Sequence, residues 1–208
     1  MICKQGGFIC VRHDEVRDVT YDMLKEVSRD VSKEPLLQKL TGEKFTYKTA
    51  VTNQEARVDV SARDFWTRGQ KAFFDVRIFE PLAHTYKGMS LEQAHIHNEQ
   101  EKMRKYRERI QQVEQGSFTP LVFTTSGGMS KQSQCFFKRL AELMAEKKNE
   151  TKGYFSKWMR VRLSFAILRS ALICLRGSRS SKQKNVDLSI LNYDETVYEC
   201  RIRKHSLV

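Results

Sequence analysis

The sequence RVDVSARDFWTRGQKAFFDVRIFEP at residues 57–81 decides how the rest of the chain is interpreted. It holds two runs rich in Val, Phe and Ile, separated by a short segment that contains Gly69. Such runs predict two antiparallel strands joined by a turn. Each run also contains an aspartate, Asp59 in the first and Asp75 in the second, at a place where apolar residues are the rule.

The two aspartates are expected to lie at about the same level of this hairpin. Side chains alternate between the two faces of a strand, so Asp59 shares a face with Ser61, and Asp75 with Arg77. Neighbouring carboxylates repel each other unless a cation lies between them, and Mg2+ prefers carboxylate, phosphate and water oxygens. The pair therefore predicts a metal site that acts on phosphate. The alternative is that both aspartates face solvent from a half-buried sheet.

Length and composition suit a globular protein. The 208 residues can form a real hydrophobic core, and 40% of them are hydrophobic and 30% charged. The net charge of +12 is uneven, because residues 131–184 carry 14 basic and 3 acidic side chains while residues 1–130 carry 20 and 18. A basic block of this kind predicts binding to a polyanion. An acidic protein partner or an anionic membrane surface would also account for it.

The cysteines and the apolar segments bear on location. Five scattered cysteines without a CxxC pair, and an N-terminus without a signal-peptide pattern, predict an intracellular, reducing compartment. The longest apolar run, residues 163–175, is interrupted by Arg169 and is shorter than the roughly 20 residues that span a bilayer. We therefore expect no transmembrane segment.

Apolar periodicity predicts the remaining elements. Ser90 has the character of a helix N-cap, and Pro120 places its strand at the edge of a sheet or close to the strand's start. The last helix is apolar enough to pack on the core while presenting a basic edge. We expect helices at residues 13–28, 91–115, 130–147 and 155–175, and strands at residues 36–37, 45–50 and 118–125 besides the hairpin.

This order of elements, with aspartates on the central hairpin, resembles the PD-(D/E)XK nuclease fold, whose core runs αβββαβ. In more detail the chain is similar to the restriction-enzyme-like endonuclease module that lies downstream of reverse transcriptase in certain non-LTR retrotransposons. The motifs that carry the resemblance are RHDE at residues 12–15, RVD at 57–59, FDV at 74–76 and KxxKY at 102–106. The resemblance implies an α/β fold, of the α+β kind in which one sheet contains both parallel and antiparallel strands. It also implies additional C-terminal helices.

The resemblance also implies a division of the chain. Residues 1–12 would be a remnant of an upstream Cys/His region, 13–130 the nuclease-like core, 131–177 basic helices packed on that core, and 178–208 a flexible linker and tail. A zinc knuckle usually precedes this module, and Cys3 alone cannot bind zinc. We therefore expect a chain truncated at its front and no zinc.

The activity implied by the resemblance is DNA nicking by a hydrolase that uses Mg2+ or Mn2+. Asp59, Asp75 and the backbone carbonyl of Val76 would hold the metal, and Glu15 could complete its shell.

A lysine normally follows the second acidic residue of this family, and here Arg77 stands in its place. A guanidinium cannot serve as a general base at neutral pH, although it can stabilise negative charge. The lysine can migrate to the following helix in the retrotransposon modules, which makes Lys102 the best candidate, with Tyr106 beside it.

Basic side chains are expected to hold the DNA backbone, or RNA as an alternative, with little reading of sequence. His13 would either contact phosphate or cap the first helix. The other candidates are Arg12, Lys105, Arg109, Lys131, Lys138, Arg139, Arg160 and Arg162. We expect neither a membrane nor a small-molecule cofactor as a partner, and the resemblance implies a nuclear location.

Departures from the family pattern support other hypotheses. Val58 stands where a proline usually precedes the first aspartate, and Arg77 replaces the lysine. A nuclease fold that has lost its chemistry and serves as a nucleic-acid-binding or protein-interaction domain would show such losses. A third hypothesis is a basic membrane-surface or adaptor protein built around residues 155–175. Only the nuclease hypothesis requires Asp59 and Asp75 to lie close together and bind metal.

Overall fold

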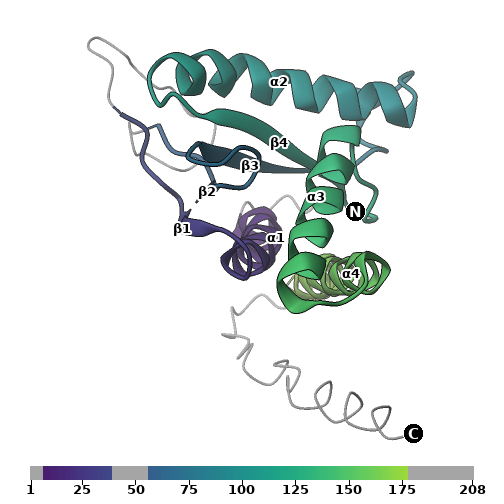
Figure 1. Cartoon of the computed structure of the whole chain (residues 1–208). Helices are drawn as coiled ribbons and strands as arrows, with labels where there is room; N and C mark the ends of the chain where they lie inside the picture. The colour runs from purple at the N-terminus through teal and green to yellow at the C-terminus, as the bar shows by residue number, and fades with distance from the viewer. Residues whose placement is uncertain (1–6, 39–55, 178–208) are drawn as a thin grey trace, which may run out of the picture.

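The computed structural model describes residues 7–38 and 56–177, and within them four α-helices surround a four-stranded mixed sheet (Figure 1). The elements are α1 Gly7–Lys25, β1 Arg29–Lys33, β2 Val60–Arg63, β3 Lys71–Phe79, the 3-10 turn η1 His84–Tyr86, α2 Leu91–Gln112, β4 Ser117–Thr124, α3 Lys131–Lys148 and α4 Lys152–Gly177. The strand expected at residues 45–50 and the linker and tail expected at 178–208 lie outside the described residues.

The sheet is built on the predicted hairpin. Its strand order is β1-β2-β3-β4, and β2 pairs with β3 in the antiparallel sense, with Val60 opposite Phe74. β3 and β4 run parallel, so the chain must cross over between them, and α2 makes that crossover. β4 is an edge strand, and its Pro120 lies opposite Asp75. The edge position predicted from this proline is confirmed, since a proline cannot donate a ladder hydrogen bond.

Apolar side chains fill both faces of the sheet. The larger core lies between the sheet and helices α1, α3 and α4, where the rings of Phe65, Phe74 and Phe136 pack with centroids 4.8 to 5.3 Å apart. A smaller core lies under α2 and includes Phe73 and Tyr106. Neighbouring residues of β3 thus point to opposite faces, as strand geometry requires. Figure 1 shows the resulting layers, with α2 on one face of the sheet and α1 on the other.

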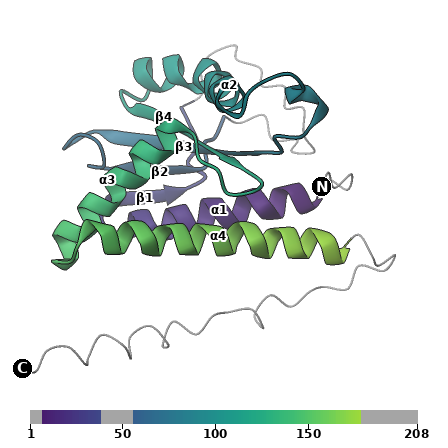
Figure 2. The ribbon, with the colours of Figure 1, turned by 90° about the vertical axis from the view of Figure 1, so that its right-hand side faces the viewer.

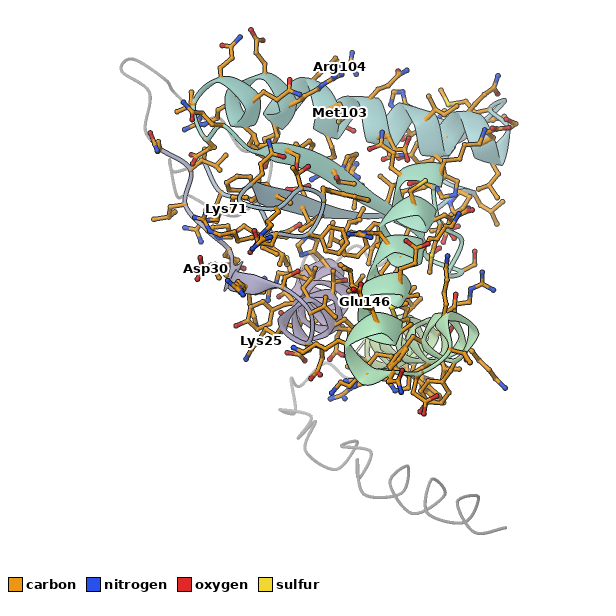
Figure 3. The ribbon with its side chains drawn as sticks, in the orientation of Figure 1. Lys25, Asp30, Lys71, Met103, Arg104 and Glu146 are labelled. Carbon is orange, nitrogen blue, oxygen red and sulfur yellow. The ribbon has the colours of Figure 1, made fainter. Side chains whose placement is uncertain are left out.

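The helix caps agree with the sequence. Ser90 caps α2 through a capping box with Gln93, and Ser130 caps α3 by accepting from the backbone N–H of Ser133. Each cap satisfies a donor of the first turn, which has no partner within the helix. The polar side of α2 points away from the sheet, as exposed Arg104 illustrates in Figure 3.

The first strand and the start of α1 differ most from the prediction. Leu36 forms only an isolated bridge with Arg57, whereas the first strand is β1, which is exposed at all positions except its partly buried central residue. An edge strand without a buried face gives no apolar alternation to detect. Helix α1 begins at Gly7 rather than at residue 13, because apolar periodicity reports only the turns that reach the core, which begin at Val16.

The last helix packs on the core as predicted. α4 lies alongside α1 and also contacts α3 (Figure 2). Phe155, Met159 and Leu163 on its inner face are buried. Among the helices of the described segments, none combines the length and the apolar character needed to cross a membrane.

Candidate active site

The structure brings Asp59 and Asp75 together. Asp59 directly precedes β2, and the register of Val60 with Phe74 places it opposite Asp75 on β3. The backbone N–H of Val76 donates to Asp59 Oδ2 at 2.5 Å. The side chains of Asp59 and Asp75 are 14% and 5% exposed. The alternative in which both aspartates face solvent is therefore wrong.

Lys102 reaches the pair from α2. Its Nζ forms an ion pair with Asp75 Oδ2, and its side chain is only 18% exposed. Burial would lower the pKa of Lys102, but the charges of Asp75 and Asp59 outweigh burial and raise it. Lys102 therefore carries a positive charge at neutral pH, next to both carboxylates.

His13 reaches the pair from α1. Its Nε2 lies 3.1 Å from Asp59 Oδ2 and its Nδ1 lies 3.3 Å from Asp14 Oδ1. Burial alone would lower the pKa of His13, but the hydrogen bond and charge of Asp59, helped by Asp14 and Asp75, raise it to about 9. The imidazole is therefore protonated at neutral pH. A capping role for His13 is wrong, because α1 begins at Gly7.

The contact between His13 and Asp59 was not predicted from the sequence. A usable signal was present, because His13 precedes Val16 by three residues and Thr20 by seven, and both of these are buried. Residues at such spacings share one face of a helix. His13 therefore belongs to the face of α1 that is turned toward the sheet.

The two carboxylates differ electrostatically. Burial would raise the pKa of Asp59, but the hydrogen bond and charge of His13, the charge of Lys102 and the N–H of Val76 lower it. Burial raises the pKa of Asp75, and the nearby charge of Asp59 raises it further, against the attraction of Lys102. Asp75 is thus the carboxylate whose negative charge is less fully compensated.

The carboxylate pair fits a hard divalent cation. Asp75 Oδ2 is buried, and in the described part of the chain the Lys102 ammonium is the group that it contacts. A divalent cation at this oxygen would have to share it with the ammonium or displace the ammonium. Mg2+ commonly takes one or two protein carboxylates and completes its shell with water and phosphate. Residues 7–38 and 56–177 contain no group of three or more His, Cys, Asp or Glu side chains placed to hold a metal.

The structure does not bring Glu15 or Arg77 to the same point. The carboxylate of Glu15 contacts Arg169 of α4 at 3.6 Å, so it is directed away from the expected metal shell. Arg77 Nε donates to Asn98 Oδ1 at 3.2 Å, and its Nη2 lies 3.8 Å from Glu101 Oε2. Arg77 is therefore held against α2, and Lys102 is the cation that contacts Asp75.

Two further candidates on α2 are largely buried. The ring of Tyr106 is 3% exposed and packs on Phe118 with centroids 5.4 Å apart. Arg109 is 9% exposed and donates to the backbone carbonyl of Gln38. These contacts hold α2 on the domain. Tyr106 was predicted beside Lys102 in the catalytic group and Arg109 as a contact to the DNA backbone, and the structure places both in packing contacts. Lys105, by contrast, is exposed above the Tyr106 ring, at 4.7 Å from its centroid.

Most of the remaining basic candidates belong to α3 and α4, whereas Lys102 belongs to α2. Lys138 and Arg160 line a hollow of about 250 Å³ between α3 and α4. Lys131 pairs with Glu92 at 2.6 Å. Arg139 donates to the Phe65 carbonyl at 3.5 Å, and Arg162 lies over the Trp158 ring at 5.0 Å from its centroid. Arg12 is partly buried on α1.

Comparison with known proteins adds no relative. No protein-family model matches the sequence, and no curated protein matches it. The geometry of the site and the order of the elements therefore carry the functional argument.

Proposed function

We propose that this chain is a metal-dependent DNA endonuclease of the PD-(D/E)XK type, akin to the module associated with reverse transcriptase in non-LTR retrotransposons. The observation that carries the proposal is the buried pair of Asp59 and Asp75 with Lys102 at its side. The element order α1-β1-β2-β3-α2-β4, with an antiparallel hairpin followed by a parallel strand, supports it.

Asp59 and Asp75 would hold Mg2+ or Mn2+, with the backbone carbonyl of Val76 as the third ligand that the family resemblance implies. A bound ion of this kind supplies a Lewis acid for the scissile phosphate and lowers the pKa of its bound water. The N–H of Val76 fixes the orientation of Asp59, and against burial the pKa of Asp59 is lowered mainly by the hydrogen bond and charge of His13, with smaller contributions from Lys102 and this N–H.

Lys102 and His13 would stabilise the charge that develops on the phosphate. Both side chains are cationic at neutral pH and contact the carboxylate pair. Cations fixed in a partly buried site stabilise a transition-state anion without having to reorganise. Asp14 accepts from the second nitrogen of His13 and holds its ring in place. Lys102 would position water or substrate.

The basic residues along α3 and α4 would hold the phosphate backbone. Exposed Lys138 and Arg160 lie together at the hollow between these helices. Contacts of this kind give salt-dependent affinity and carry no sequence information. DNA is the proposed substrate, RNA is the alternative, and a nuclear location accompanies the proposal.

A second candidate function is nucleic-acid or protein binding on the same fold without catalysis. The observation that favours it is that each carboxylate already contacts a cation of the chain, Asp59 with His13 and Asp75 with Lys102. Such a cluster is satisfied without metal. Arg77 at the usual lysine position agrees with this candidate.

Plasmid nicking separates the two candidates. Purified chain is incubated with supercoiled plasmid and Mg2+ or Mn2+, with and without chelator, beside Asp75→Asn and the control Asp22→Asn. Asp22 is an exposed carboxylate on α1, so its loss changes the charge equally but leaves the site intact. The proposal predicts nicking that Asp75→Asn and chelator abolish and that Asp22→Asn retains. Absence of nicking, together with salt-sensitive plasmid binding, would establish the second candidate instead.

A further inference from the structure

Helix α4 carries a second apolar face besides the one that packs on the core. Large apolar side chains on it are 38% to 55% exposed, and we call them the α4 outer stripe: Tyr154, Val161, Phe165, Leu168 and Leu172. Trp158, partly buried, lies between the first two. With it, successive members are separated by four, three, four, three and four residues, which is the a/d repeat of a coiled coil.

The width of the outer stripe indicates what would cover it. A strict a/d stripe is the narrow seam that receives a single helix, whereas a helix that lies in a membrane surface has a broader apolar face. α4 lies on the outside of the domain, beside α1 (Figure 2). A helix could therefore approach the stripe without displacing any of the described helices or strands.

The charges beside the stripe indicate the character of that helix. α4 contains no Asp or Glu, and Lys157, Arg160 and Arg162 lie next to stripe residues. A second copy of α4 would bring like charges together along the seam, which opposes pairing. The complementary partner is a helix with apolar residues at the same repeat and acidic residues beside them.

We propose that residues 186–200 of the same chain bind the α4 outer stripe as an antiparallel helix. These residues lie outside the described part of the chain, and their sequence is VDLSILNYDETVYEC, with four acidic and no basic side chains. Five of their eight apolar residues repeat at intervals of four, three, four and three: Val186, Ile190, Tyr193, Val197 and Cys200. Leu188, Leu191 and Tyr198 are the other three. The segment thus has both the repeat and the charge that the stripe requires.

The connection favours this intramolecular partner. Eight residues, 178–185, separate the end of α4 from the acidic segment, and helix–helix connections of about two to eight residues join antiparallel neighbours. A short tether also gives a segment an effective concentration of the order of millimolar. In the antiparallel arrangement Ile190 meets Leu172, Tyr193 meets Leu168, and Cys200 meets Val161.

Disulfide trapping tests this register in the full chain. Val161→Cys is oxidised mildly, and the bonded peptides are identified by mass spectrometry. The proposal predicts an intramolecular disulfide between position 161 and Cys200. Arg104→Cys is the control, because Arg104 is exposed on α2, on the other face of the sheet (Figure 3), and it should trap Cys200 several-fold less.

Charge variants extend the test and leave the stripe unchanged. Replacing Asp194 and Glu195 by lysine should lower the yield of the 161–200 disulfide several-fold, while Ser189→Ala should leave it unchanged. Equal trapping at positions 104 and 161 would overturn the proposal. A disulfide that joins two chains would overturn it in favour of a second copy. Absence of the 161–200 disulfide in solution, together with binding of the chain to anionic vesicles, would overturn it in favour of a membrane surface. The outcome does not depend on nuclease activity.

Discussion

Removing Lys102 should destabilise the fold through the charge that it leaves on Asp75. In Lys102→Met the apolar part of the side chain is kept and the ammonium is lost. Asp75 is 5% exposed, and apart from the Lys102 ammonium its Oδ2 has no hydrogen-bond partner among the described residues, so an isolated carboxylate would remain in a buried place. Loss of one partner of a buried ion pair costs about 3–5 kcal/mol.

Two features reduce this cost in the present site. Lys102 is 18% exposed, and Asp75 can take up a proton because its pKa is already raised. We therefore expect Lys102→Met to lower the free energy of unfolding by about 2–3 kcal/mol near neutral pH. The folded state of the variant binds a proton on Asp75 at pH values where the unfolded state does not, so its stability falls as pH rises. The loss should accordingly be smaller at about pH 5 than at about pH 8.

Urea unfolding at both pH values measures the effect. The double variant Lys102→Met/Asp75→Asn should recover most of the loss, because a neutral amide needs no counter-charge. Lys131→Met is the matched control, since Lys131 pairs with Glu92 on the exposed surface and its loss should not change stability measurably. Equal stability of Lys102→Met and the parent chain at both pH values would refute the electrostatic account of the site.

Two further predictions concern stability. His13 has a folded pKa of about 9 against an ordinary value of 6.5, so its contribution to stability is complete below about pH 6.5 and is lost as pH rises through 9. His13→Asn should remove this pH dependence of the free energy of unfolding, measured with urea. A free energy of unfolding that does not change over this pH range in the parent chain would contradict the assignment. In Gly116→Ala the new methyl would lie 2.6 Å from the Lys71 carbonyl and 2.7 Å from the Phe73 ring, so the free energy of unfolding should fall by about 1–3 kcal/mol. Gly153→Ala, with open space around it, is the control, and equal effects of the two variants would contradict this reasoning.

The sequence predicted the hairpin and its aspartates because both depend on local patterns. Apolar alternation located β2 and β3, and two carboxylates in apolar runs identified Asp59 and Asp75. The register could not be predicted, since a connection of the length of residues 64–70 can close in several ways. It is this register that places the aspartates opposite each other.

Contacts between distant residues were the part that the sequence could not supply. Arg109 was expected to contact the DNA backbone, yet it donates to the backbone carbonyl of Gln38, which lies 71 residues earlier. The partner of His13 is likewise 46 residues away. Helical periodicity shows which side chains lie on the same face of a helix. It does not show which other element of the fold that face contacts.

Binding of Mn2+ measures most directly whether Asp59 and Asp75 form a metal site or a cluster satisfied by the chain's own cations. Electron paramagnetic resonance of free Mn2+, titrated with the protein, gives the bound fraction without requiring activity. Our account predicts saturable binding by the parent chain and by Asp22→Asn, and loss of that binding in Asp75→Asn. Absence of Mn2+ binding in the parent chain, or binding that Asp75→Asn leaves unchanged, would contradict the assignment of this pair as a catalytic metal site.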